Sequence, residues 1–325
     1  MLIKIRGVGT SEPYSERINM ANRVTIGIPI YNEEKTLQHT LSSVESSAQK
    51  LNIAYEIILC FNGTTDNGRE IAIQYQKRSD NLKIIDSIKG KSKAILKILD
   101  SAQNDEVIFC DADVIVDKNC FQHLLKNFKI PYIMAVTGSP KPINKNNLIS
   151  KILNARMTYP KSEVARLPLE GCLEKPFIHG RIYALKKSIL SKEDTKNKFK
   201  ESIGDDTFLT HYIIKNYGRK SIIKEDKAVV NYVPVQSIKS WWDKWFRIWS
   251  DLDKIYEDNP EFRELKPFMQ TKLDWNYISK LPMPTPLHFV AERVIHHAGK
   301  NYAKFIKNKR KDVWRRLGDT KTITK

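Results

Sequence analysis

The chain has 325 residues, of which 41% are hydrophobic and 28% are charged, and its formal net charge is +18. This composition is ordinary for a folded protein and excludes a fibrous or fully disordered chain. No apolar run approaches the ~20 residues of a membrane-spanning helix, and no signal peptide opens the chain, so we expect a cytoplasmic protein. Its size suits one large domain with additions, or two domains. Four cysteines without CxxC spacing are expected to be buried, reduced thiols.

Strands and helices alternate along the first 140 residues. After a polar arm (1–22), the apolar run 24–30 is typical of a buried strand, and Leu37, Leu41 and Val44 follow at helical spacing. The same pattern predicts strands at 56–61, 82–86, 106–110 and 132–138, and helices at 69–78, 92–102 and 118–128. This alternation predicts a mostly parallel α/β sheet flanked by helices.

The second half of the chain is less regular. We expect helices at 147–157 and 204–217, a strand at 177–185, and one or two short strands within 220–233. A helix over 237–256 carries four of the six tryptophans, and residues 286–325 hold 11 Lys and Arg against 3 Asp and Glu. A basic segment of this kind suits nucleic acid, an anionic membrane surface or solvent.

Polar clusters follow three of the expected strands, at 31–34, at 62–66 and at Asp111 with Asp113. Ligands of open α/β sheets bind outside the carboxyl ends of the strands. Asp111 and Asp113 are two residues apart, so in an extended chain their side chains point the same way. Two carboxylates suit Mg²⁺ or Mn²⁺, particularly where phosphate oxygens complete the coordination. The alternative is a polar turn after a buried strand.

Five short motifs occur in a fixed order on the expected elements. They are Pro-Ile-Tyr-Asn-Glu-Glu at 29–34, Asn-Gly-Thr-Thr-Asp at 62–66, Lys-Gly-Lys-Ser-Lys-Ala at 89–94, Asp-Ala-Asp at 111–113 and Gly-Asp-Asp-Thr-Phe-Leu at 204–209. Together they resemble the motifs of the inverting family-2 glycosyltransferases, over about residues 22–250. The resemblance implies a Rossmann-like GT-A fold, with a mixed, mostly parallel sheet. Asn62 and Asp205 depart from the family pattern, which has Asp and Glu there.

The resemblance also implies a role for each matching residue. Asp206 is then the general base that takes the proton of the acceptor hydroxyl. Donor binding is assigned to Pro29, Tyr31, Glu33, Asn62, Asp66, Lys91, Asp111 and Asp113. The last two carboxylates are also the metal ligands, Asp113 foremost, for Mg²⁺ or Mn²⁺. Asp205, His179, Arg181 and Arg247 are assigned to the acceptor or to phosphate.

The implied organisation is an N-terminal arm (1–22), a GT-A domain (23–235) and a basic, Trp-rich helical region (236–325). The nucleotide-sugar half of the GT-A domain extends to about residue 140. The implied reaction is metal-dependent transfer, with inversion, of a sugar from a nucleotide-diphosphate donor, UDP-linked, to an acceptor hydroxyl. Polymerising members carry Gln-x-x-Arg-Trp, whereas residues 244–248 read Lys-Trp-Phe-Arg-Ile. Non-processive transfer is therefore expected.

Other interpretations of these residues stay open. Glu33, Glu34, Asp205 and Asp206 also fit acids that favour the first turn of a helix, and His179 fits an ordinary strand residue. A sugar nucleotidyltransferase of related fold is one alternative, although the sequence lacks its Gly-rich phosphate loop. A basic nucleic-acid-binding or scaffold protein is another, but no reader motif is present, and no nucleic acid is expected.

The Trp-rich helix raises a second question. Trp241, Trp245 and Trp249 recur every four residues between Lys and Arg, and 286–306 is also partly apolar. Tryptophan favours membrane interfaces, which suggests a peripheral enzyme on the inner face of the membrane with a lipid-linked acceptor. The alternative is that these helices pack on the sheet or form a homodimer interface.

Overall fold

A computed structural model of the chain describes residues 23–143, 147–155, 166–167, 177–266, 272–273 and 275–306. The expected N-terminal arm, Cys172 and the basic residues after Ile306 lie outside these ranges. The division of the chain into parts at residues 22 and 235 stays a prediction. Cys60, Cys110 and Cys120 are buried and free, as expected.

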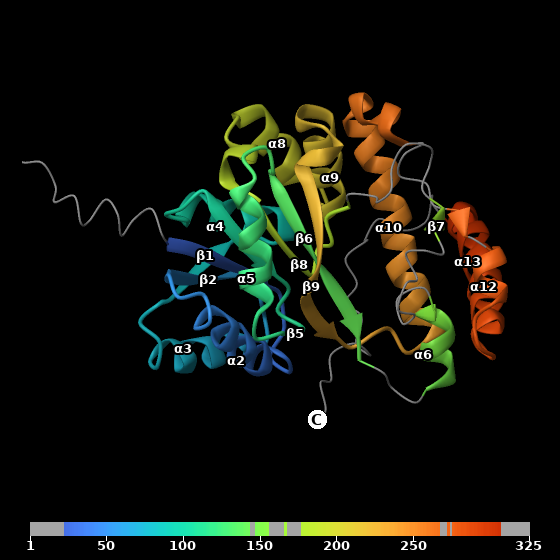
Figure 1. Cartoon of the computed structure of the whole chain (residues 1–325), viewed down its shortest axis with the longest axis horizontal. Coiled ribbons are helices and arrows are strands. Elements are labelled where there is room, and N and C mark those ends of the chain that lie inside the picture. Colours follow the sequence, from blue (N-terminus) through green and yellow to red (C-terminus); the bar gives the residue numbers. More distant parts are fainter. Residues whose placement is uncertain are drawn as a thin grey trace, which may run out of the picture.

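A mixed sheet of eight strands lies at the centre of the molecule, in the order β3-β2-β1-β4-β8-β6-β9-β5 (Figure 1). The four strands from β3 to β4 are parallel, β8 runs antiparallel to both β4 and β6, and β9 is parallel to β6. The strands are β1 Arg23–Ile30, β2 Ala54–Asn62, β3 Leu82–Ser87, β4 Glu106–Cys110, β5 Val114–Val116, β6 Ala135–Pro142, β8 Ile182–Lys186 and β9 Ile222–Tyr232. A separate pair joins β7 Arg166–Leu167 to β10 Lys272–Leu273. The expected mixed, mostly parallel sheet is therefore confirmed.

Helices cover both faces of this sheet (Figure 1). Successive side chains of a strand point to opposite faces, so Ile57 and Leu59 join one core, and Ile58 and Cys60 the other. The first core is covered by α2 Leu37–Ala48, α3 Gly68–Gln76 and α5 Cys120–Leu125, and the second by α4 Lys91–Ser101, α8 Glu193–Glu201 and α9 Asp205–Tyr217. Short 3₁₀ turns are η1 Lys126–Lys129, η2 Lys187–Leu190, η3 Arg219–Ser221 and η4 Pro260–Leu265.

The central strand β1 shows why these layers pack closely. It pairs with β2 on one side and β4 on the other, so both of its faces are buried. At Gly27 a Cβ atom would lie 2.6 Å from Cγ2 of Ile98 in α4. Because glycine leaves this space free, α4 packs directly on the backbone of β1 and brings its first residue, Lys91, to the edge of the sheet.

Several elements differ from the expected ones. Helix α2 begins at Leu37, so Glu33 and Glu34 precede its first turn, and their interpretation as helix-start acids is wrong. The strand expected at 177–185 begins only at Ile182. The helix expected at 147–157 is the shorter α6 Leu148–Leu153. Strand β5 and helix α8 were not predicted, because three apolar residues and a mostly polar helix carry little periodic signal.

Beyond the sheet, α10 Ile238–Asp258 stands between the α/β layers and the helices α6, α12 Trp275–Ser279 and α13 Thr285–Ile306 (Figure 1). The indole of Trp241 is buried and donates a hydrogen bond to the carbonyl of Leu153, at 3.0 Å. Trp242 likewise donates to the carbonyl of Ile295 in α13, at 3.2 Å. These bonds tie α10 to both neighbouring helices.

The tryptophan face of α10 packs within the protein. The ring of His296 in α13 stands edge-on to Trp241, Trp245 and Trp249, with centroid distances of 5.7, 4.8 and 5.1 Å. We expected these rings at a membrane, on the sheet or in a homodimer interface; in the structure they contact His296 of α13, a helix of the same chain. Within the described ranges, no helix is both long and apolar enough to cross a membrane.

Candidate active site

The carboxyl ends of β1, β2, β3 and β4 meet at one edge of the sheet, and Asn62 links three of them. Its Nδ2 donates to the carbonyl of Ile30 at the end of β1, at 2.8 Å, and its Oδ1 accepts from the backbone N–H of Gly90, at 3.4 Å. A carboxylate could not donate to Ile30, since it has no hydrogen to offer at neutral pH. This gives a physical reason for Asn at a position where the family motif has Asp.

The loop after β2 is closed by a second set of hydrogen bonds. Asp66 accepts from the backbone N–H of Glu34 at 2.9 Å and from that of Gly68 at 3.1 Å. In return, the Glu34 carboxylate accepts from the backbone N–H of Asn67 at 3.0 Å. The first two motifs of the sequence therefore form one connected structure. Both carboxylates have protein partners here, and a role in donor binding is a proposal.

Three further expected donor residues lie beside this loop. Pro29 is buried inside β1, where a missing N–H is unusual for a central strand. Tyr31 follows the strand, and Nζ of Lys89 lies 5.1 Å from the centre of its ring. Glu33 is buried and accepts a hydrogen bond from the hydroxyl of Thr36, at 3.0 Å.

Lys91 is at the centre of the site. Its Nζ lies 2.7 Å from Oδ1 of Asp111 and 3.3 Å from Oδ2 of Asp205, and it donates to the carbonyl of Gly180 at 3.1 Å. The ammonium therefore joins the third, fourth and fifth motifs of the sequence. Burial lowers the pKa of Lys91, but the two carboxylates outweigh it and raise the pKa above its ordinary value, so Lys91 stays charged.

The turn before β8 explains why that strand begins late. Three successive backbone N–H groups donate to side chains rather than to a neighbouring strand: Ile178 to Thr210 Oγ1 (3.0 Å), His179 to Thr137 Oγ1 (2.8 Å) and Gly180 to Asp206 Oδ2 (3.1 Å). The interpretation of His179 as an ordinary strand residue is therefore wrong. Because of this turn, the Gly180 peptide groups contact both Lys91 and Asp206.

Asp206 is half-buried at the start of α9. Besides Gly180, its carboxylate accepts from the backbone N–H of Thr207 at 2.7 Å. Asp205 is buried beside it, and burial raises the pKa of Asp205 to about 7, with Asp206 adding to the shift and Lys91 opposing it. Two adjacent carboxylates in different surroundings are an arrangement found in acid–base catalysis.

Arg181 contacts the first residue of the Asp-x-Asp motif through its backbone. Its carbonyl accepts from the backbone N–H of Asp111 at 3.1 Å, and its guanidinium stacks over the ring of Tyr232 at 3.9 Å. Burial lowers the pKa of Arg181, but Tyr232, Asp113 and Asp111 more than compensate. Its Nε is buried and has no hydrogen-bond partner within the described ranges.

Helix α10 contributes a row of charged residues that the sequence did not single out as a group. Lys244, Arg247 and Asp251 recur at i, i+3 and i+7, so they lie on one helical face. Further along this face Ile255 is buried, and its Cδ1 lies 3.5 Å from the place of a Cβ on Gly204. This face of α10 therefore covers the start of α9, where Asp205 and Asp206 lie.

The surroundings of Lys244 and Asp251 shift the pKa of each side chain in the direction that favours its neutral form. Burial, together with the positive charges of Arg181 and Arg247, lowers the pKa of Lys244 to about 7. Burial raises the pKa of Asp251 to about 7, and Arg247 opposes this while Asp206 and Asp205 add to it. The charged residues of α10 therefore interact electrostatically with the carboxylates at the start of α9.

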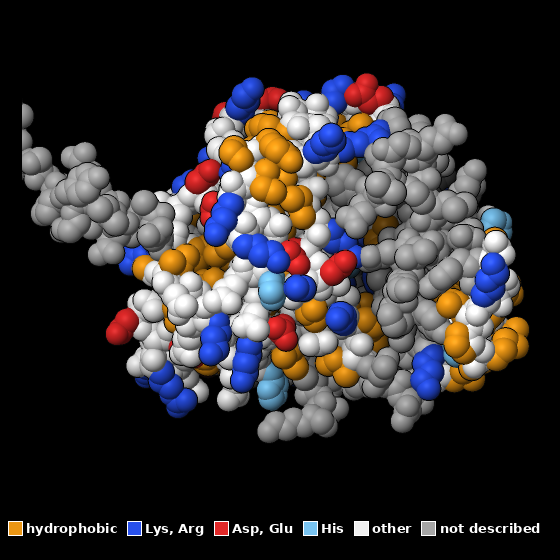
Figure 2. Space-filling model, in the orientation of Figure 1, with side chains coloured by type: hydrophobic (Ala, Val, Ile, Leu, Met, Phe, Trp, Pro, Cys, Tyr) orange, Lys and Arg blue, Asp and Glu red, His pale blue; other side chains and the backbone are white. Residues whose placement is uncertain are grey.

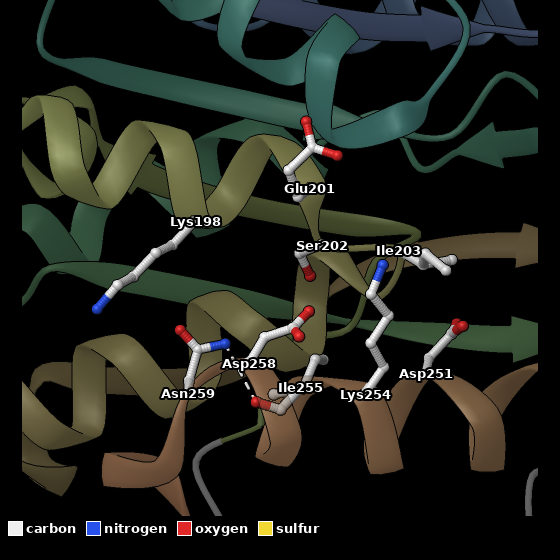
Figure 3. Close-up of a pocket in the computed structure, with 9 residues that line it drawn as sticks. All are labelled: Lys198, Glu201, Ser202, Ile203, Asp251, Lys254, Ile255, Asp258 and Asn259. Atoms are coloured by element: carbon white, nitrogen blue, oxygen red, sulfur yellow. Dashed lines mark hydrogen bonds between the residues drawn. The ribbon is translucent and has the colours of Figure 1, made fainter.

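Asp251 also borders a narrow crevice between the end of α8 and α10 (Figure 3). Its walls are formed by Lys198, Glu201, Ser202, Ile203, Lys254, Ile255, Asp258 and Asn259. The crevice lies beside the carboxylate cluster and shares Asp251 and Ile255 with the residues discussed above. The Oδ1 atom of Asp251 is buried without a hydrogen-bond partner in the described part of the chain.

The donor chemistry suits a hard divalent cation. Asp111 and Asp113 are half-buried and offer carboxylate oxygens, which Mg²⁺ and Mn²⁺ prefer. Among the described residues, no group of three or more His, Cys, Asp and Glu side chains is arranged to hold a metal ion. Two carboxylates fit a cation that takes further oxygens from a bound diphosphate.

Fold and site together are those of a GT-A glycosyltransferase. The sequence model "Glycosyl transferase family 2" matches residues 25–193, more than half of the chain. The chain therefore belongs to glycosyl transferase family 2. This finding supports the glycosyltransferase interpretation over the nucleotidyltransferase and nucleic-acid-binding alternatives.

Two kinds of relative support this assignment. Poly-beta-1,6-N-acetyl-D-glucosamine synthase of Staphylococcus aureus (strain COL) is 33% identical over 134 residues, which are 40% of this chain and 31% of that protein. The synthase of Staphylococcus epidermidis is 35% identical over 128 residues, 38% of this chain and 29% of that protein. The chain thus matches about a third of the length of these relatives.

A solved structure shares the fold over more of the chain. The mannosyltransferase PcManGT from Pyrobaculum calidifontis, in complex with GDP-Man and Mn²⁺, superposes with a TM-score of 0.55 and 17% identity. The superposition covers 88% of this chain and 79% of the mannosyltransferase. It confirms the GT-A fold.

The structure brings most of the expected site residues to one edge of the sheet. Lys91, Asp111, Asp205 and Asp206 are linked through direct contacts with one another or with Gly180. Asn62 ends β2 and Asp66 lies in the loop that follows, and Arg247 approaches from α10. Sequence reasoning missed Gly180, Lys244 and Asp251. The charged spacing on α10 was a usable signal for the last two.

Proposed function

We propose that the protein transfers a sugar from a nucleoside-diphosphate sugar, UDP-linked, to an acceptor hydroxyl, with inversion at the anomeric carbon and with a divalent cation. The observation that carries this proposal is the cluster in which Lys91 bridges Asp111 and Asp205, next to Asp206. The cluster combines a cation-binding pair, a fixed positive charge and a second carboxylate pair at one strand edge.

The donor side of the reaction needs stabilisation of the leaving diphosphate. Asp113 and Asp111 would hold Mg²⁺ or Mn²⁺, and the cation supplies positive charge to the phosphate oxygens. PcManGT, of the same fold, was solved with GDP-Man and Mn²⁺. Arg181 and Lys91 add fixed positive charge at the same edge. Pro29, Tyr31, Glu33, Asn62 and Asp66 form the adjoining wall and are proposed to hold the nucleotide.

The acceptor side needs a base, which we assign to Asp206. Its carboxylate accepts hydrogen bonds from the backbone N–H groups of Gly180 and Thr207, which hold it in place, and a carboxylate in reach of a hydroxyl can take its proton. Asp205 is less suited, because it is buried and already paired with Lys91. His179 and Arg247 are proposed to contact the acceptor or a phosphate group. A direct attack by the acceptor on the anomeric carbon inverts its configuration.

The acceptor is proposed to be lipid-linked, with the protein acting as a peripheral enzyme at the inner face of the membrane, and transfer is proposed to be non-processive. The motif at 244–248 supports single transfer, since Lys244 and Ile248 replace the Gln and Trp of polymerising members. Homodimer formation stays open as a prediction.

The test is a panel of nucleotide sugars, including UDP-sugars and GDP-mannose, assayed with Mg²⁺ or Mn²⁺ for release of nucleoside diphosphate. Asp206→Asn should abolish transfer but keep donor binding. Asp113→Ala should weaken binding of both metal and donor. Asp226→Asn is the matched control, because Asp226 is a surface residue paired with Lys224 at 2.8 Å, away from the site. Full activity of Asp206→Asn would show that the base is another residue.

A further inference from the structure

Helix α13 is apolar on two opposite faces. Its inner face holds the buried Phe289 and the carbonyl of Ile295, which accepts from Trp242. Its outer face carries Leu287, Val290 and Val294 at i, i+3 and i+7, with 56%, 48% and 64% of each residue exposed. An apolar stripe along a helix normally packs against another part of a protein. The outer face of α13 is therefore a surface that lacks its apolar partner within the described ranges.

This apolar surface extends beyond the helix. Met283 precedes α13 and is 70% exposed, and Trp275 of α12 is 47% exposed. Figure 2 shows hydrophobic atoms gathered over α12 and α13 at the right edge of the molecule, interspersed with Lys and Arg. We call Trp275, Met283, Leu287, Val290 and Val294 the outer patch.

The charges around the outer patch are positive. Lys280 and Lys300 are exposed on either side of it. The one acid between residues 275 and 301 is Glu292, which is buried and paired with Arg293 at 3.0 Å. The chain continues beyond α13 with residues 307–325, which contain 8 Lys and Arg and 2 Asp. An exposed apolar stripe with basic surroundings is the pattern of a helix that lies in a membrane interface.

We propose that the outer patch on α12 and α13 docks the protein onto the surface of an anionic lipid bilayer. The apolar side chains enter the boundary between headgroups and acyl chains, and the flanking cations contact lipid phosphates. The Trp face of α10, in contrast, packs against α13 and holds this helix in place. The proposal concerns membrane attachment and is independent of the residues assigned to catalysis.

Charge favours a bilayer over a second copy of the chain as the occupant. In a two-fold symmetric dimer the same patch meets itself, so Lys280 and Lys300 of one copy would approach the cations of the other. Such an interface would bring like charges together, whereas anionic headgroups neutralise them. A bilayer satisfies the apolar stripe and its basic rim at the same time.

The test is flotation of the full chain with vesicles of phosphatidylcholine alone or with added phosphatidylglycerol. We expect binding to the anionic vesicles at low salt, weakened by high salt because exposed charges are screened. The variant Leu287→Gln/Val290→Gln/Val294→Gln should bind at least tenfold more weakly. Its matched control is Ile53→Gln/Ile73→Gln/Ile130→Gln, which changes three exposed residues elsewhere and should bind as the unaltered protein does.

Three outcomes would overturn the proposal. The unaltered protein does not float with anionic vesicles at low salt, or the triple outer-patch variant floats equally well. Alternatively, light scattering without lipid finds a dimer that the outer-patch variant turns into a monomer, which would assign the patch to a second copy. Circular dichroism checks folding, and if the triple variant is unfolded, Val294→Gln alone should reduce binding by a smaller factor. Flotation needs no sugar donor, so its failure leaves the proposed reaction untouched, and the reverse is equally true.

Discussion

The backbone N–H of Gly180 donates a hydrogen bond to Oδ2 of Asp206, at 3.1 Å. A Cβ atom on Gly180 would lie 2.9 Å from that oxygen and 3.4 Å from Nζ of Lys91. The space beside the proposed base is therefore just large enough for a residue without a side chain. This places a glycine between the donor-side lysine and the acceptor-side carboxylate.

Gly180→Ala should lower kcat sharply while leaving the protein folded. The added methyl displaces the Asp206 carboxylate, and misplacing a catalytic group by about 1 Å can reduce the rate roughly 10²-fold. Donor binding, measured by titration calorimetry, should change much less, since the methyl meets Asp206 before it meets Lys91. An alanine variant with unaltered kcat would show that Asp206 does not need this geometry.

Asp251→Asn should stabilise the protein, and by more at pH 8 than at pH 5. Burial raises the pKa of Asp251 to about 7 in the folded protein. The stability of the folded state therefore falls as the pH rises from the unfolded pKa, near 4, to about 7. At pH 5 the carboxyl is neutral in the folded protein but mostly ionised in the unfolded chain, so only the first part of this loss is present and the gain is smaller, about 1–2 kcal/mol. With about 1.4 kcal/mol per pKa unit, the gain at pH 8 is of the order of 2–4 kcal/mol.

Urea unfolding of Asp251→Asn at both pH values measures this difference. Asp253→Asn, two residues along α10, is a suitable comparison. An equal gain at pH 5 and pH 8 would contradict the assignment of the effect to ionisation of Asp251.

Binding of the donor should draw a proton onto Lys244. Burial and the two arginines at 181 and 247 lower its pKa to about 7, so a fraction of Lys244 is neutral at pH 7.5. A diphosphate entering the site adds negative charge and raises this pKa. Titration calorimetry in buffers of different ionisation enthalpy measures the proton taken up. Lys244→Met should abolish that uptake, and uptake that persists in the variant would place the titrating group elsewhere.

Lys91→Met should destabilise the protein more at pH 8 than at pH 5. The substitution leaves Asp111 and Asp205 without their shared cation, and removing one partner of a buried pair costs about 3–5 kcal/mol. A smaller loss, roughly 1–3 kcal/mol, is expected here because Lys91 and Asp111 are each about a fifth to a quarter exposed. At pH 5 Asp205 is largely protonated, given its pKa of about 7, so less charge is left unpaired.

Urea unfolding also checks the lysine prediction. Lys196→Met is the matched control, since Lys196 forms a surface ion pair with Asp100 at 3.0 Å. Surface pairs contribute at most about 1 kcal/mol, so the control should be nearly neutral. A larger loss in Lys196→Met than in Lys91→Met would contradict the central position of Lys91.

The sheet and its polar edge were predictable because periodicity and strand ends are local signals. The run before Asp111 alternates with helices, and that alternation alone predicts parallel strands whose ends meet. A local sequence pattern does not predict which side chain accepts a hydrogen bond from which backbone N–H group. Residues 177–181 are apolar and basic enough to suggest a strand, yet Thr137, Thr210 and Asp206 take their N–H groups.

The packing partners of α10 could not be predicted from the sequence either. Its tryptophans predict an apolar face, but a helix sequence does not state what covers that face. Only the fold shows that Trp241 meets α6 and that Lys244 and Asp251 share the side turned to the carboxylates. For the same reason, the sequence showed Asn62 only as a departure from the family motif. In the structure its amide donates a hydrogen bond to Ile30 that a carboxylate could not make.

Three indole rings of α10 contact the imidazole of His296 in α13. Their fluorescence therefore reports the packing of these two helices. Release of α13 from α10 would hydrate the same rings and shift their emission to the red. Four of the six tryptophans lie on α10, so the native chain carries its own spectroscopic probe of this helix pair without any added label.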